Sequence, residues 1–111
     1  MNGIYAMFYT GISGIGNAVF IMVDGKISGA DVSGGILDGE YTAIKNNRVT
    51  FQARLTTPVG ATLVTGQTVA DKPITQEVSA TLSANFANGS PVQIQMPMGP
   101  VNVAFRKLRD L

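Results

Sequence analysis

Apolar and polar residues alternate with a period of two through most of the chain. The clearest example runs from Arg48 to Leu55, where Val49, Phe51, Ala53 and Leu55 alternate with polar residues. Because successive side chains of a strand point to opposite faces, this pattern predicts strands with one face in a core and the other toward water. No window shows the 3.6-residue apolar spacing of a helix together with a cap. The pattern therefore predicts an all-β protein.

Tight turns separate the alternating segments. Asp24-Gly25 lies between two extended runs, and both central residues of a type I′ turn need φ > 0, which Gly adopts freely and Asp tolerates. Asn46-Asn47 and Asn88-Gly89 indicate further turns, because Asn accepts the left-handed region at low cost. The predicted strands are Gly3–Thr10, Ala18–Val23, Lys26–Ala30, Ile36–Ile44, Arg48–Leu55, Ile74–Phe86, Val92–Met96 and Val101–Leu108.

These strands follow one another at short intervals, except across Thr56–Pro73. That stretch is rich in Thr, Gly and Val, and we expect a mobile loop with at most one short strand near Ala61 to Val64. Consecutive hairpins build an antiparallel meander, and closing the meander removes its unpaired edges. The length of 111 residues is that of one domain, residues 1–111. We predict a small antiparallel up-and-down β-barrel of about eight strands, with a two-sheet sandwich as the alternative.

Five aromatic residues occupy positions that the alternation assigns to the barrel interior. An eight-stranded barrel can either fill this space with side chains or hold one small ligand. The short strands of this chain favour filling, and a lipid-type pocket is the alternative. The interior candidates are Phe20, Tyr41, Phe51, Phe86 and Phe105.

The apolar content is high for a chain in which no apolar run approaches the ~20 residues that span a bilayer. Mean hydropathy is +0.21, and the first two predicted strands are apolar on both faces. Only one face can point into a narrow barrel, and a large outward apolar patch usually marks an interface. We therefore predict a homodimer. The residues expected at its interface are Tyr5, Met7, Tyr9, Ala18 and Met22.

The composition lacks the commonest catalytic side chains. There is no His and no Cys, so the usual general base, the usual intracellular nucleophile and any thiolate metal site are absent. Asp38 and Glu40 could straddle a small substrate, but two solvated acids beside a turn are the simpler interpretation. Asp24, Asp31 and Asp38 do not have the spacing of a calcium loop. We expect no enzyme, no cofactor and no metal.

The charge balance argues against nucleic acid and membranes as partners. A net charge of +1 creates no long-range field. Arg48 and Arg54 share an outward strand face, but Thr50 and Gln52 lie beside them rather than the aromatic side chains that bind single strands. The N-terminus lacks the basic region and cleavage site of a signal peptide. These features favour a cytoplasmic protein.

Several short motifs in the first half of the chain match a known family. They are Asn2-Gly-Ile-Tyr5, Gly14–Asp31 with its Asp24-Gly25-Lys-Ile-Ser-Gly29 turn, Asp38-Gly39-Glu-Tyr41-Thr42, and Val49–Leu55. Over roughly residues 2–55 the chain resembles the GrlR-like family, negative regulators of type III secretion gene expression. The resemblance implies a compact lipocalin-like barrel, bacterial, cytoplasmic and often dimeric, that acts by binding a partner protein.

One departure limits what the resemblance implies. The best-known member carries an acidic Glu-Asp-Glu-Asp run on the turn that corresponds to Lys45–Arg48, and this run implies contact with a basic transcriptional activator. Here the turn is neutral to basic, so only the fold and the protein-binding role carry over. The sequence therefore predicts a non-enzymatic regulatory module that dimerises and binds another protein. A calycin-type carrier of a small hydrophobic ligand is the alternative.

Overall fold

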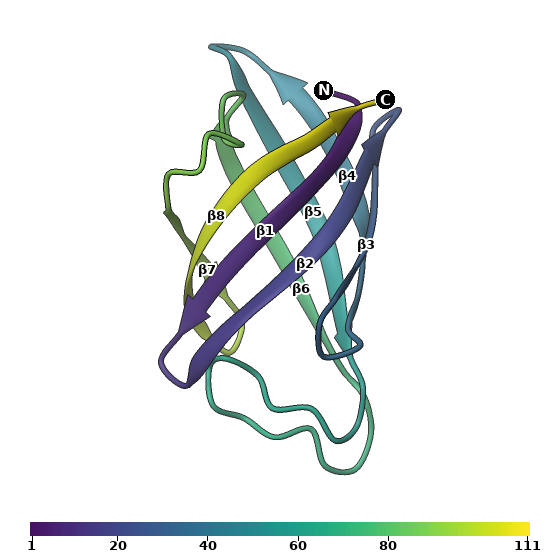
Figure 1. The fold of residues 1–111 in the computed structure, drawn as a ribbon, viewed down its shortest axis with the longest axis vertical. Helices are drawn as coiled ribbons and strands as arrows, with labels where there is room; N and C mark the ends of the chain where they lie inside the picture. Colours follow the sequence, from purple (N-terminus) through teal and green to yellow (C-terminus); the bar gives the residue numbers. More distant parts are fainter.

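The computed structural model describes all residues, 1–111, and contains eight β-strands and no helix. Every neighbouring pair of strands is antiparallel, in one sheet of order β6-β5-β4-β3-β2-β1-β8-β7. The sheet curls into an elongated barrel of 41 × 23 × 22 Å (Figure 1), which confirms the predicted up-and-down barrel. The strands are β1 (Gly3–Gly11), β2 (Gly14–Val23), β3 (Lys26–Asp31), β4 (Ile36–Ile44), β5 (Arg48–Thr57), β6 (Ile74–Ser83), β7 (Val92–Met96) and β8 (Gly99–Asp110).

The barrel closes by bringing the end of the chain back to its beginning. β8 lies beside β1, so the first strand is hydrogen-bonded on both sides, by β2 and by β8 (Figure 1). No ladder joins β6 to β7, the two edges of the sheet, although Cα atoms of the two strands approach within 8 Å. The barrel is therefore nearly closed, with one seam between β6 and β7.

The hairpin turns have the backbone that their residues predict. Asp24 and Gly25 have φ of 49° and 82°, and Asn46 and Asn47 have φ of 64° and 56°. Most side chains clash with the backbone in this left-handed region, whereas Gly, Asn and Asp adopt it. These turns fix the registers of β2 with β3 and of β4 with β5.

The segment expected to be a mobile loop instead covers one end of the barrel. Residues 58–73 cross the lower end as drawn in Figure 1, and Thr62 and Thr68 form an isolated bridge within them. Leu63 and Val69 are buried, and Ser13 N donates to Val64 O over 2.7 Å. The sequence of this Thr- and Gly-rich stretch has no regular apolar pattern and so did not predict packing. Its scattered apolar side chains, such as Leu63 and Val69, nevertheless pack against the rest of the protein.

The residues expected at a dimer interface lie inside the barrel. Tyr5, Ala18 and Met22 are 3%, 5% and 0% exposed, and Met7 and Tyr9 are half-buried against the core. The reason is the period of two, which places Ala18 and Met22 on the same face as the core residue Phe20. The opposite face of β1 and β2 is the outward one.

Both chain termini lie at the upper end of the barrel in Figure 1. Tyr5 near the start of β1 and Phe105 near the end of β8 belong to a packed aromatic core in this upper half. The ring of Tyr5 stacks on that of Phe20 with centroids 5.3 Å apart, and the ring of Phe86 contacts Tyr5, Phe51 and Phe105. The five interior candidates all lie here. Phe20, Phe86 and Phe105 are buried, and Tyr41 and Phe51 pack against them.

Two valines of the 58–73 segment test whether it is packed on the barrel. Val69 is 1% exposed and Val59 is 49% exposed. We expect Val69→Ala to lower the free energy of unfolding by about 2 kcal/mol, because it removes buried methyl groups and leaves a cavity. Val59→Ala should cost less than about 0.5 kcal/mol. Urea unfolding measures both values, and equal small effects would mean that the segment is not packed.

Candidate functional site

The lower half of the barrel interior contains a cavity of about 190 Å³. It lies below the aromatic core, and twenty of the 26 residues that line it are apolar. They come from the inner faces of the strands and from the 58–73 segment. A cavity of about 150 Å³ can hold benzene, so this cavity has room for a somewhat larger molecule.

Small side chains create this space. On the inner faces of β5 and β6, Ala53 lies opposite Val78, and Ala80 lies opposite Phe51. Ala53, Val78 and Ala80 are small, and all three line the cavity. The sequence expectation of a filled barrel therefore holds only in the upper half, where aromatic rings occupy the interior. Below them the side chains are too short to meet across the barrel.

One buried polar group in the cavity wall has no hydrogen-bond partner. Gln76 lies on the inner face of β6, opposite Leu55 of β5, and is 5% exposed. Its Oε1 accepts no hydrogen bond from the protein. Nearly all buried polar atoms in proteins are paired, and an unpaired one costs stability. The alternation of Val78, Ala80 and Leu82 extends two residues back to Gln76, so this pattern could have identified it.

Tyr9 and Asp31 form a second polar site at the cavity. Tyr9 Oη donates to Asp31 Oδ2 over 3.3 Å. Asp31 Oδ1 accepts from Ser33 N, Ser33 Oγ and Gly35 N at 2.7–3.0 Å. Burial raises the pKa of the Tyr9 phenol well above its ordinary value, and the Asp31 charge adds to the effect. Asp31 therefore stabilises the β3–β4 turn, and Tyr9 remains neutral.

The cavity opens at the lower end of the barrel. Exposed lining residues come there from the β1–β2 hairpin, the β3–β4 turn and residues 62–65, and we infer that the mouth lies between these segments. Ile15 and Val32 line the cavity and are nevertheless 81% and 73% exposed. A small molecule can therefore reach the interior past these two apolar side chains.

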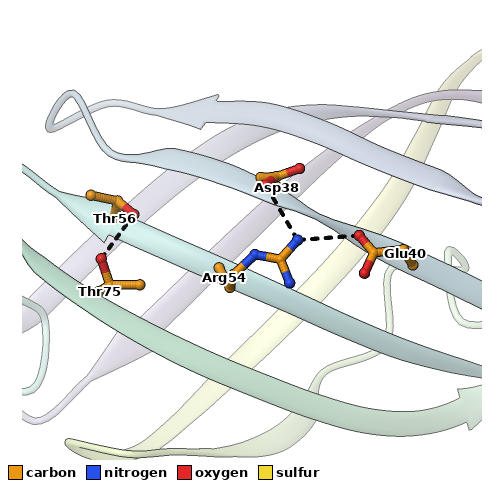
Figure 2. Close-up of polar contacts among 5 residues, drawn as sticks. All are labelled: Asp38, Glu40, Arg54, Thr56 and Thr75. Atoms are coloured by element: carbon orange, nitrogen blue, oxygen red, sulfur yellow. Dashed lines mark hydrogen bonds and ion pairs between the residues drawn. The ribbon is translucent and has the colours of Figure 1, made fainter.

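The carboxylate pair considered for catalysis lies outside the barrel. Figure 2 shows Arg54 of β5 between Asp38 and Glu40 of β4, with Nη2 3.3 Å and 3.2 Å from their carboxylate oxygens. Hydrogen bonds to Asp38 and then Glu40 raise the pKa of the Arg54 guanidinium. All three side chains are exposed, so the ion pairs add little stability. Neither acid lines the cavity.

The outer face carries other cross-strand contacts of this kind. Thr56 and Thr75 share a hydrogen bond of 3.1 Å between β5 and β6, also drawn in Figure 2. Within β8, by contrast, Lys107 pairs with Asp110 of the same strand, and its Nζ lies 5.6 Å from the centre of the ring of the buried Tyr5, the residue opposite it on β1. No group of three acidic side chains is arranged to hold a metal ion. The structure contains no helix long and apolar enough to cross a membrane.

The buried tyrosines predict a loss of stability at alkaline pH. The pKa of Tyr9 is raised in the folded protein, and burial also raises that of Tyr5. Their contribution is therefore complete below the unfolded pKa of about 10 and is lost as pH rises above it. We expect Tyr9→Phe to reduce this loss by about 1 kcal/mol per pH unit. Urea unfolding at several pH values between about 9 and 11 measures the slopes, and identical slopes would contradict the assignment.

Comparisons with protein-family models, with curated proteins and with solved structures found no match. The function must therefore be inferred from the chain's own geometry. Two features are available for that inference: the cavity in the lower half of the barrel, and the outward apolar face of β1 and β2.

Proposed function

We propose that the protein is a non-enzymatic binding protein that holds a small, mainly apolar molecule in the lower half of its barrel. The observation that carries this proposal is the cavity of about 190 Å³, which is lined by apolar side chains and open at one end. Ligand sites are typically preformed apolar cavities with a few polar groups that orient the ligand. Gln76 and Tyr9 provide such groups here.

The chemistry of the cavity wall supports binding rather than catalysis. Asp31 is the only charged residue that lines it, and its carboxylate is engaged by Tyr9 and by its own turn. The chain has no His or Cys that could act as a base or nucleophile. A molecule in this cavity would meet mainly aliphatic and aromatic side chains.

Filling the cavity tests the proposal. Ala80 points into the cavity, and Ser79, its neighbour on β6, is exposed on the outer face. We expect Ala80→Leu to abolish binding of 4-ethyltoluene, an apolar probe, because the added carbons occupy its site. Ser79→Leu adds the same side chain outside and should leave binding unchanged. Calorimetric titration measures the affinity, and thermal unfolding shows that both variants are folded.

The outcome can contradict the proposal in two ways. If neither 4-ethyltoluene nor its hydroxyl analogue 4-ethylphenol gives a binding isotherm with the unmodified protein at two temperatures, the cavity is not a binding site. If Ala80→Leu binds the probe as tightly as the unmodified protein, the probe binds elsewhere.

An exposed apolar surface favours a second function, in which the protein binds a second copy of itself. The outer patch consists of the outward residues Phe8, Val19, Ile21 and Val23, which are 38–51% exposed. Ile4 pairs with Ile21 across β1 and β2, which makes the patch continuous. Exposed apolar patches of this kind mark interaction sites. Residues 1–23 contain no charged side chain, so a second copy would bring an equally uncharged surface.

This second proposal agrees with what the GrlR-like resemblance implies: a cytoplasmic regulator that forms dimers and binds another protein. It differs from the sequence expectation in the residues involved. The dimer would use the outer patch of β1 and β2, because Tyr5, Met7, Tyr9, Ala18 and Met22 face the interior.

A charge placed in the outer patch tests self-association. At micromolar concentration we expect sedimentation to give a mass near twice 11.6 kDa. Val19→Lys should shift the protein to the monomer, because a buried unpaired ammonium disfavours the interface. Thr81→Lys places the same charge on the exposed outer face of β6 and should leave the dimer intact. A monomer without concentration dependence in the unmodified protein would refute the proposal.

A further inference from the structure

Resting on the proposed ligand site, we infer the chemical class of its ligand: a neutral molecule with an apolar body and one hydroxyl group. Its hydroxyl donates a hydrogen bond to Gln76 Oε1, and carboxylates are excluded. Alkylphenols and alcohols of about nine non-hydrogen atoms belong to this class. The juxtaposition that carries the inference is an unpaired buried amide oxygen in the wall of a mainly apolar cavity.

The first step is the unmet hydrogen bond of Gln76. Its side chain lines the cavity and is 5% exposed, and its Oε1 lacks a donor and has almost no accessible surface of its own. A ligand hydroxyl therefore reaches the amide only when the end of the Gln76 side chain turns toward the cavity. Thr57 lies diagonally across on the inner face of β5, yet its hydroxyl is also unpaired, so the two groups do not satisfy each other. A hydroxyl suits a primary amide best, because it can donate to the oxygen and accept from the nitrogen.

The second step compares Gln76 with the other polar groups of the cavity. Tyr9 already donates to Asp31, and both oxygens of Asp31 have donors from the protein. Ser33 and Thr62 line the mouth and are exposed to water, and the hydroxyl of Thr65 already donates to Gln67 Oε1. Gln76 is therefore the buried polar group whose hydrogen bonding a ligand would complete.

The third step concerns charge. No Lys or Arg lines the cavity, and the one charged residue is the acid Asp31. A carboxylate ligand would lose its hydration without gaining a counter-ion, and it would be repelled by Asp31. An ammonium group would have one counter-ion, Asp31, but would have to leave water for a lining that is otherwise apolar. A neutral ligand avoids both costs.

The fourth step sets the size. The volume of about 190 Å³ exceeds the roughly 150 Å³ that accommodates benzene. The difference allows an aromatic ring with a short alkyl substituent and a hydroxyl, as in 4-ethylphenol. A long lipid chain would extend beyond the cavity.

Three matched probes test the inference by calorimetric titration: 4-ethylphenol, 4-ethyltoluene and 4-ethylbenzoate. The first two differ only by a hydroxyl in place of a methyl group, and the third carries a carboxylate. We define the preference as the Kd of 4-ethyltoluene divided by that of 4-ethylphenol. In Gln76→Leu this preference should fall about tenfold, the effect of losing one buried hydrogen bond. 4-Ethylbenzoate should bind at least about tenfold more weakly than 4-ethylphenol.

The matched control is Gln52→Leu. Gln52 is exposed on the outer face of β5, so its replacement should leave the preference unchanged. A second test uses the unmodified protein and therefore does not depend on how a variant folds. In a ¹H–¹⁵N spectrum, 4-ethylphenol should shift the side-chain amide resonances of Gln76 more than 4-ethyltoluene does.

The outcomes separate this inference from the proposed function. If the hydrocarbon and the phenol both bind but Gln76→Leu leaves their preference unchanged, the cavity is a ligand site and the hydroxyl assignment is wrong. Equal shifts of the Gln76 amide by both probes, or binding of 4-ethylbenzoate as tight as that of the phenol, would also overturn it. If none of the probes binds, the proposed function itself fails.

Discussion

In a nearly closed barrel of eight strands, each strand has one face inside and one outside, and the narrow interior cannot accept both. The contact between Tyr5 of β1 and Phe20 of β2, two directly paired residues whose rings stack, shows which face is inside. Once these two rings are in the core, the period of two sends Met7, Tyr9, Ala18 and Met22 inward as well. It also sends Phe8, Val19 and Ile21 outward. The interior surface and the outer patch both follow from this single choice.

The same constraint accounts for the division of the interior into a packed half and an open half. A barrel interior has a fixed width, so the side chains on opposing strands must be large enough to meet. Phe20 and Phe105 satisfy this condition near the termini, together with Phe86 of the β6–β7 connection. Toward the other end, Ala53 and Ala80 do not, and the barrel keeps its width because the backbone ladders hold it open. The buried amide of Gln76 lies in the wall of this open half, where its cost in stability is consistent with a role in binding.

Local chemistry made much of the fold predictable. Asp24-Gly25 and Asn46-Asn47 need only their own backbone preferences to form turns, and the alternation from Arg48 to Leu55 needs only the geometry of one strand. The candidate site was harder to predict from the sequence. Gln76 could have been identified by extending an alternating pattern backward, but a lone inward Gln in a sequence does not indicate whether a neighbouring strand supplies its donor. Asp38 and Glu40 were considered as a catalytic pair, but the structure gives both a partner that the sequence pattern did not indicate. That partner is Arg54, which lies 14 to 16 residues away on the paired strand.

The sequence by itself determined that the protein is all-β, where most of its strands begin and end, and that it has no His or Cys for catalysis. These properties depend on residue types and on spacings within one strand or turn. Only the tertiary structure decided which apolar face of β1 and β2 points inward, how residues 58–73 cover the lower end, and that a cavity remains there. Each of these depends on distances between strands far apart in the chain, and a pattern along one strand carries no information about the size of the side chains across the barrel.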